Sequence, residues 1–287
     1  MPVKLKFENV NLTYSSSDGA VQALSGFELQ LKAGEPVALI GPSGSGKTSS
    51  LLLAAGLLQA SQGQVTVDDQ LLSKPRSQTA LILQDYGLLP WKTVYENVAL
   101  GLQIRKVSHL ERQAKTQVAL AQVGLESFAR MYPDELSGGM RQRVALARVL
   151  TLDADLLLMD EPLSSLDALL RESMQDMLLE LWLERCYAQL LVTHSIEEAA
   201  FLGARILVMD QRPGRVRAVI ANPEMGSLEY RRDPSFFAVC QQIREALFLG
   251  TGSGEDSGAS SGTGSGEGSG TGSDIDTCAL ATESKHA

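Results

Sequence analysis

A glycine-rich loop that ends in a lysine and a threonine occupies positions 41–48. Its residues are, in order, Gly41, Pro42, Ser43, Gly44, Ser45, Gly46, Lys47 and Thr48. Glycines let a backbone wrap closely around phosphate with several N–H groups pointing inward. This pattern predicts a phosphate loop, in which the Lys47 ammonium reaches the outer phosphates and the Thr48 hydroxyl holds magnesium. The alternative is a chance glycine-rich turn, but the apolar run 37–40 before the loop and the helical pattern after it favour a phosphate site.

Two acids follow another apolar run and form the predicted catalytic end of the site. The run 156–159 consists of three leucines and a methionine, and Asp160 and Glu161 come directly after it. An open α/β sheet presents the carboxyl ends of its parallel strands at one edge, so we expect these acids beside the phosphate loop. We predict that Asp160 binds magnesium through water and that Glu161 polarises the attacking water. The alternative is a pair of ordinary loop acids.

A second candidate anion site precedes another helical pattern. Ser137, Gly138 and Gly139, here called the signature segment, stand directly before a run that continues through Arg148. A hydroxyl, free N–H groups and a helix N-terminus together suit an anion. A helix cap with flexible glycines explains the same residues. One nucleotide needs only one phosphate cradle, so a second cradle suggests a site shared by two chains.

Six ordered motifs resemble those of the ATP-binding subunits of ABC transporters, over about residues 3–248. They are 41–48, Gln84, 136–142, 160–161, 165–167 and His194. The resemblance implies the ABC ATPase fold, with ATP and Mg²⁺ as cofactors. It also implies a homodimer in the ATP-bound state, in which two chains pack head to tail. Each ATP would then lie between the phosphate loop of one chain and the signature segment of the other.

The resemblance implies roles for four further residues. Gln84 would lie near magnesium and the attacking water, and would connect the site to the membrane partner. Asp167 would lie in the loop that crosses the dimer interface. His194 would contact the γ-phosphate and help to hold Glu161, and Tyr14 would stack on adenine. Without the resemblance, these four residues have ordinary explanations: a turn residue, a helix cap, a core histidine and an aromatic side chain in an edge strand.

Two short stretches depart from the family pattern. The loop before Asp167 contains Ser164 and Ser165, where small residues such as glycine and alanine are common. The phosphate loop is followed by Ser49 and Ser50, where the family usually has threonine or serine and then leucine. Both changes are mild, and neither puts a catalytic role in doubt.

Short apolar runs alternate with helical patterns along the chain, which predicts an α/β fold with a P-loop NTPase core. The runs are 37–40, 81–83, 156–159, 190–193 and 206–209. Strands this apolar suit a sheet that is covered on both faces. Helices are expected over 48–58 and about 234–249. Residues 3–33 predict an N-terminal antiparallel β subdomain whose strands are joined by a loop at 15–19.

We expect one domain over 1–249 with an α-helical insert at about 88–150. Ser108 and Glu111 predict a capping box in this insert. The apolar positions that mark one face of the following helix are Leu110, Ala114, Val118 and Ala121. Residues 250–287 are rich in glycine and serine and carry six acids against one lysine, which predicts a disordered acidic tail.

Charge and hydropathy limit the class of protein. The chain has 287 residues and a formal net charge of -9. A general nucleic-acid-binding protein is more often basic, so we predict no nucleic-acid partner. The chain has no run of about 18 apolar residues, so the membrane part of a transporter would be a separate polypeptide.

Four segments are similar to those of importers of nitrate, aliphatic sulfonates and taurine: 84–91, 96–98, 196–200 and 212–216. This similarity implies ATP hydrolysis coupled to uptake of a small solute. The partners would be integral-membrane permease subunits and, indirectly, a periplasmic or lipoprotein solute-binding protein. The chain would be peripheral, on the cytoplasmic face of the inner membrane. Leu88, Leu89, Pro90 and Trp91 would receive a short permease helix, or else pack the core of the insert.

Other functions within the same family are open alternatives. Importers of pyrimidine precursors share much of this sequence, and an exporter subunit is also compatible. An ABC-type ATPase of DNA repair, chromosome organisation or translation is less favoured, because a single phosphate loop in 287 residues leaves no room for a long coiled coil or a second ATPase half. A regulator without hydrolysis is disfavoured by Glu161 and His194.

Overall fold

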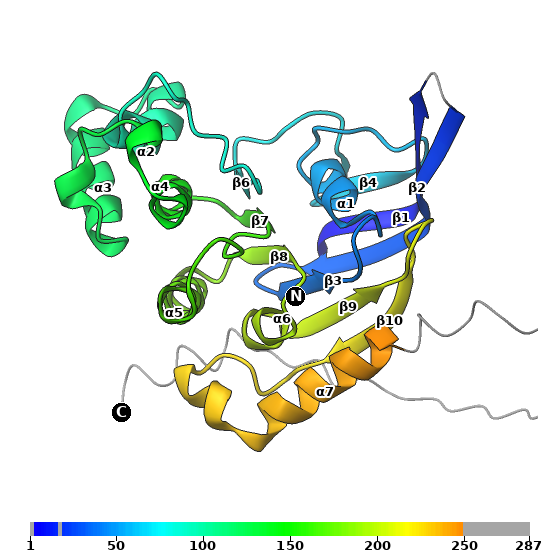
Figure 1. Ribbon diagram of the computed structural model, residues 1–287. Helices are drawn as coiled ribbons and strands as arrows, with labels where there is room; N and C mark the ends of the chain where they lie inside the picture. The colour runs from blue at the N-terminus through cyan, green and yellow to red at the C-terminus, as the bar shows by residue number, and fades with distance from the viewer. Residues whose placement is uncertain (1–2, 17–18, 249–287) are drawn as a thin grey trace, which may run out of the picture.

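The computed structural model describes residues 3–16 and 19–248, which form two β-sheets and a group of helices (Figure 1). The strands are β1 (Val3–Ser16), β2 (Gly19–Lys32), β3 (Pro36–Ile40), β4 (Gln62–Val67), β5 (Gln70–Leu71), β6 (Thr79–Ile82), β7 (Leu156–Asp160), β8 (Ala188–Thr193), β9 (Arg205–Met209) and β10 (Val216–Ala221). The α-helices are α1 (Lys47–Ala54), α2 (Val94–Ile104), α3 (His109–Gln122), α4 (Gly138–Leu150), α5 (Ala168–Arg185), α6 (Ile196–Leu202) and α7 (Pro234–Phe248). Short 3-10 helices are η1 (Glu126–Phe128), η2 (Pro133–Glu135) and η3 (Leu228–Arg232). The tail predicted at 250–287 lies outside the described residues.

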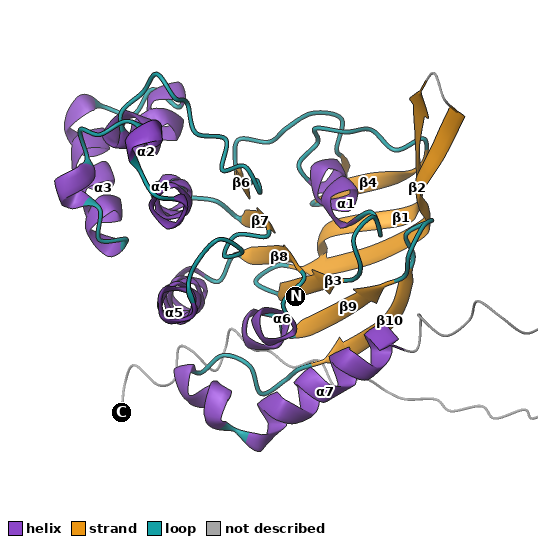
Figure 2. Ribbon diagram, in the orientation of Figure 1, coloured by secondary structure: helices purple, strands orange, loops and turns teal. Residues whose placement is uncertain are grey.

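The larger sheet has the strand order β10-β9-β3-β8-β7-β6, and all neighbours are parallel except β9 and β10. Its central strands are buried at every position because both faces are covered, as their aliphatic sequences predicted (Figure 2). Alternate residues of β3 enter different cores. Ala38 and Ile40 pack in the core that includes α6, whereas Val37 and Leu39 pack with α1 and the smaller sheet.

The smaller sheet is antiparallel, with the order β2-β1-β4-β5. It confirms the antiparallel strands predicted for 3–33, while the middle of the predicted loop, 17–18, lies outside the described residues. Phe7 and Phe27 meet edge to face in its core with ring centroids 5.2 Å apart. β4, β5 and β10 were not predicted, because these short or half-exposed strands have no continuous apolar run.

Between β6 and β7 the chain forms the helices α2, α3 and α4, which gather at one side of the molecule, away from the smaller sheet (Figure 1). The predicted Ser108 cap is present, because its hydroxyl accepts a hydrogen bond from Glu111 N. The apolar face marked on this helix, however, lies toward solvent, and Leu110 is 79% exposed. The packed residues of α3 are instead Thr116, Ala119 and Leu120, because α2 and α4 contact that side.

Element boundaries differ from the predicted ones mainly at α1. The helix ends at Ala54 rather than near Leu58. Gly56 has a φ of 71°, and a Cβ there would lie 2.7 Å from the carbonyl carbon of Lys74. The chain therefore turns at Gly56, where helical continuation is prevented. Among the described residues, no helix combines the length and the apolar character that crossing a bilayer requires.

Candidate functional site

The phosphate loop connects β3 to α1 and is closely packed on both sides. Gly44 and Gly46 have φ values of 79° and 85°, in the region that glycine adopts without strain. A Cβ on Gly46 would lie 2.6 Å from Leu24 Cδ2 and 2.8 Å from the Ala23 carbonyl oxygen. The glycine at position 46 is therefore required both by its backbone conformation and by β2, which passes directly behind it.

A segment from the C-terminal part of the chain also lies against this loop. Gly214 N donates to the Ala23 carbonyl at 2.9 Å, and Ser25 N donates to the Gly214 carbonyl at 3.1 Å. A Cβ on Gly214 would come within 2.0 Å of the Ser45 carbonyl oxygen. Two backbones that are distant in sequence thus hold the phosphate loop in place.

Lys47 is the first residue of α1, and its side chain folds over the loop. Its Nζ donates to the carbonyl oxygens of Gly41 at 2.7 Å and Pro42 at 2.9 Å. Burial lowers the pKa of Lys47, while the nearby carboxylates of Glu161 and Asp160 act in the opposite direction. The ammonium is therefore positioned at the mouth of the loop, where a phosphate oxygen would be a stronger partner than a carbonyl.

Asp160 and Thr48 form the part of the site that suits a magnesium ion. Asp160 is the buried last residue of β7. Burial raises the pKa of this carboxyl, and a hydrogen bond from the Thr48 side chain opposes the rise. Mg²⁺ prefers hard oxygen ligands and is usually held by one or two protein groups together with substrate phosphates and water. Among residues 3–16 and 19–248, no group of three or more His, Cys, Asp or Glu side chains is placed to hold a metal ion.

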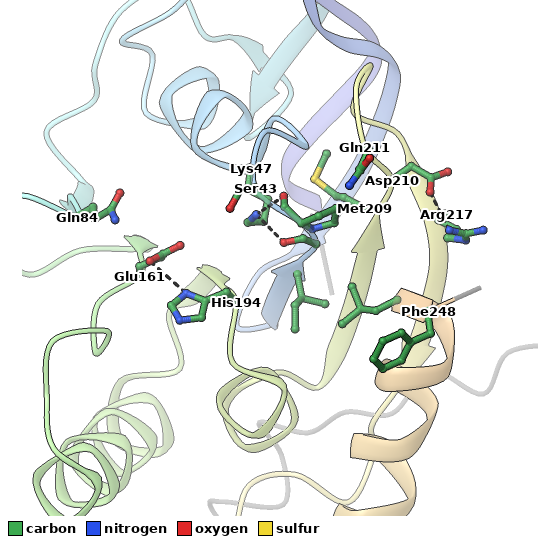
Figure 3. Close-up of a pocket in the computed structure, with 14 residues that line it drawn as sticks. Ser43, Lys47, Gln84, Glu161, His194, Met209, Asp210, Gln211, Arg217 and Phe248 are labelled. Atoms are coloured by element: carbon green, nitrogen blue, oxygen red, sulfur yellow. Dashed lines mark hydrogen bonds and ion pairs between the residues drawn. The ribbon is translucent and has the colours of Figure 1, made fainter. Parts of the chain in front are cut away.

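Glu161 and His194 meet at the carboxyl edge of the larger sheet. Glu161 adopts a φ of 47°, and its N–H donates to the Val192 carbonyl at 2.8 Å. His194 follows β8, and its Nδ1 lies 3.2 Å from Glu161 Oε2 (Figure 3). The imidazole is 63% exposed on its side chain, so the alternative of a buried core histidine is wrong.

These groups line a cavity of about 640 Å³ at the mouth of the phosphate loop. Gln84, which follows β6, lies on the same side as Glu161 and His194 (Figure 3). The opposite wall was not predicted from the sequence. It consists of Met209, Asp210, Gln211, Arg217, Leu247 and Phe248. The only available signal was the position of Asp210 directly after an apolar run, at the same edge of the sheet.

Tyr14 lines a second hollow of about 370 Å³ together with Gly46, Lys47 and Thr48. Its hydroxyl lies 3.1 Å from Ser49 Oγ, and its ring is partly exposed. Arg212 also lines this hollow, and a Cβ on Gly44 would lie 3.0 Å from its Nε. In the sequence, Arg212 is notable only as part of the segment 212–216, which is similar to that of importers. Its proximity to the loop depends on the approach of the C-terminal segment, which local sequence does not reveal.

The signature segment and Asp167 line neither of these two hollows. Ser137 caps α4 by accepting a hydrogen bond from Met140 N at 3.2 Å. Asp167 caps α5 by accepting one from Leu170 N at 3.0 Å. Both residues therefore act as helix caps, which was the alternative explanation for each of them. Neither lies at the phosphate loop of its own chain.

Comparison with known proteins identifies the family. Residues 24–164 match the family model described as ABC transporter. The taurine import ATP-binding protein TauB of Rhizobium johnstonii is 44% identical over 215 residues, which cover 75% of this chain and 82% of TauB. The chain belongs to the ABC transporter ATP-binding proteins. The sequence-based identification of the family and its ATPase activity is thereby confirmed.

Three further comparisons extend over most of this ABC transporter ATPase. The nitrate import ATP-binding protein NrtD of Synechocystis sp. is 36% identical over 251 residues, which cover 85% of this chain and 94% of NrtD. The dimeric structure of MJ0796, a bacterial ABC transporter cassette, matches with a TM-score of 0.71 and 33% identity over 76% of this chain and 98% of that one. MJ0796 bound to ADP and Pi in a post-hydrolysis state matches with a TM-score of 0.70. The predicted ABC ATPase fold is confirmed.

Proposed function

We propose that this ABC ATPase hydrolyses ATP with Mg²⁺ at the phosphate loop and uses the reaction to drive uptake of a small solute. The observation that carries the proposal is the Glu161–His194 pair, 3.2 Å apart, in one cavity with Lys47. An anion-binding loop beside a carboxylate and an imidazole is what attack of water on a terminal phosphate requires.

Residues around the mouth of the phosphate loop have separate roles in this proposal. Lys47 would bind the outer phosphates, and Thr48, Asp160 and Gln84 would hold Mg²⁺. A bound magnesium ion neutralises charge that develops on the phosphate oxygens. Glu161 orients the attacking water and accepts its proton. His194 keeps the Glu161 carboxylate in position and donates to the γ-phosphate.

We propose that the complete site needs two chains packed head to tail. The signature segment caps a helix and carries two glycines, which leaves N–H groups for an anion. It is absent from the hollows around Lys47, so its ligand would be the ATP of a partner chain. Asp167 would cross the interface between the chains, and Tyr14 would stack on the adenine of its own chain's ATP.

Replacing the proposed catalytic carboxylate tests this function most directly. Glu161→Gln retains the shape of the side chain but cannot accept a proton, so we expect ATP turnover to fall on the order of 100-fold or more. ATP binding is expected to persist, and light scattering should detect a stable ATP-bound dimer. Glu180→Gln, at an exposed acid of α5, is the matched control. Turnover near the wild-type rate in Glu161→Gln would refute the role of this residue.

The proposed direction of transport rests on relatives. The names of TauB and NrtD state import of taurine and nitrate, and these proteins are 44% and 36% identical to this chain. We propose a solute of the taurine, sulfonate or nitrate class, a permease partner, a periplasmic or lipoprotein solute-binding protein, and a peripheral position on the cytoplasmic face of the inner membrane. A pull-down from native membranes tests this: a permease and a secreted binding protein support import, whereas recovery of only soluble partners refutes transport.

Trp91 is the residue that we propose to anchor the permease. Its side chain is 71% exposed, whereas Leu88 packs against the core that includes α6. The segment is therefore attached to the protein through Leu88 and leaves the Trp91 ring available as an anchor for a partner. We expect Trp91→Ala to reduce co-purification of the permease and to leave nucleotide affinity unchanged. Leu110→Ala, at another exposed apolar residue of the helical region, is the control. Normal co-purification of Trp91→Ala would exclude the anchor role.

A further inference from the structure

Three elements with separate roles in the proposed function meet at Ser165. This residue lies two positions before Asp167 in the loop between β7 and α5. Its hydroxyl lies 3.0 Å from Gln142 Oε1 and 2.5 Å from Tyr86 Oη. Gln142 lies on α4, the helix that begins with the signature segment, and Tyr86 lies two positions after Gln84. One hydroxyl group of the Asp167 loop therefore contacts a side chain from each of the other two elements.

The hydrogens of these groups impose an order on the contacts. A serine hydroxyl has a single hydrogen, which Ser165 donates to Gln142 Oε1. The Tyr86 hydroxyl must then donate to Ser165 Oγ. Rotation of the amide by half a turn reverses the order of donors but keeps the three groups joined. Gln142 is fully buried, so loss of its serine partner leaves an amide oxygen unsatisfied in the interior.

The backbone around Tyr86 shows that the tyrosine is held in place. Its φ is 64°, a left-handed conformation that is costly for a bulky side chain. Its N–H donates to the Leu83 carbonyl at 2.9 Å. The next residue is also attached to α4, because Arg148 Nη1 donates to the Gly87 carbonyl at 3.0 Å. The loop after Gln84 is thus fastened to the signature helix directly at Arg148 and, through Ser165, at Gln142.

We propose that Ser165 is a positioning residue that makes the Gln84 loop, the Asp167 loop and the signature helix move as one unit. A displacement of the Gln84 loop would then shift Asp167 and the signature segment together. The inference rests on the roles proposed above for Gln84 and Asp167. An alanine at position 165 would leave Tyr86 without this partner.

The full-length chain with Ser165→Ala, Tyr86→Phe or both changes tests the connection. Each single variant removes one of the two hydroxyl groups that link Tyr86, Ser165 and Gln142. We therefore expect kcat for ATP hydrolysis to fall about threefold to tenfold. KM and the Kd for ATP should stay within about twofold, because neither residue lines the phosphate loop. The kcat of the double variant should be no lower than that of the slower single variant. All three variants interrupt the same hydrogen-bonded link between Tyr86, Ser165 and Gln142.

Two further variants separate positioning from a general loss of structure. Ser165→Thr retains a hydroxyl and is expected to keep the wild-type kcat. Ser173→Ala, at an exposed serine of α5, should also have no effect. The inference would be overturned by an unchanged kcat in Ser165→Ala. It would also be overturned if the fold decrease in kcat of the double variant equalled the product of the two single decreases. If the Ser165 inference fails in this way but Glu161→Gln loses turnover, the proposed function still holds. A wild-type protein without ATPase activity would overturn both the inference and the proposed function.

Discussion

The phosphate loop and the signature segment are the two proposed anion cradles, each at a helix N-terminus, and they are held in different ways. The phosphate loop lies between β3, α1 and two crossing backbones, with Gly46 against Ala23 and Gly214 against Ser45. The signature segment begins α4 and is connected to the rest of the site by side chains, through Ser165 and the Gln84 loop. The phosphate loop is thus held by backbone contacts, whereas the helix of the signature segment is held through side-chain contacts with two loops.

The largest expected difference in ATP affinity is between two variants that each add one methyl group, one in the phosphate loop and one in the signature segment. Gly46→Ala places a Cβ 2.6 Å from Leu24 in a left-handed residue, so we expect ATP affinity to fall on the order of 100-fold or more. A Cβ on Gly139 would lie 3.0 Å from Leu166 Cδ2, the end of a flexible side chain. Gly139→Ala should therefore keep the single-chain affinity and lower turnover only. Titration with a fluorescent ATP analogue distinguishes the two, and equal losses of affinity would contradict the comparison.

A smaller effect on affinity is expected at Tyr14, which lines the hollow beside the phosphate loop and is proposed to stack on adenine. Loss of one stacking ring costs about 1–3 kcal/mol, so the Kd for ATP should rise on the order of tenfold in Tyr14→Ala. Tyr14→Phe keeps the ring and loses only the contact with Ser49, and is the control. Comparison of ATP with inorganic triphosphate is decisive, because the proposed stacking affects ATP alone. A similar loss for triphosphate would place the defect in the loop.

Glu198 should affect stability rather than affinity. Burial raises its pKa to about 7 from an ordinary value of 4.5, opposed by the hydrogen bond from Thr193 and by the charges of His194 and Arg171. Between these pH values the folded chain binds more protons than the unfolded chain, so the free energy of unfolding falls as the pH rises. Glu198→Gln removes this pH dependence. As the pH rises through this window, the free energy of unfolding of Glu198→Gln should therefore increase relative to wild type by on the order of 1–3 kcal/mol.

Urea unfolding at about pH 5 and about pH 8 measures the Glu198 effect. Glu180→Gln, at an exposed acid, should follow the wild-type pH dependence. An equal difference between Glu198→Gln and wild type at both pH values would show that this carboxyl does not titrate in the window.

The strands of the core and the residues of the cradle were predictable because their signals are local. The buried runs of β3, β7 and β8 and the spacing of 41–48 each suffice without knowledge of the rest of the chain. The exposed face of α3 was not predictable, since burial there depends on how α2 and α4 approach. Arg212 and Phe248 were missed for the same reason: their place at the site results from tertiary packing and not from a motif.

The packing of Gly214 on Ser45 means that the site is completed late in protein synthesis. β3 and the phosphate loop leave the ribosome early, but the strands on either side of β3, which are β8 and β9, follow much later. A nascent chain that ends after the signature segment lacks both strands and the segment that supports Ser45. If nucleotide binds at the phosphate loop as proposed, we expect it to stabilise only chains whose C-terminal half has been made.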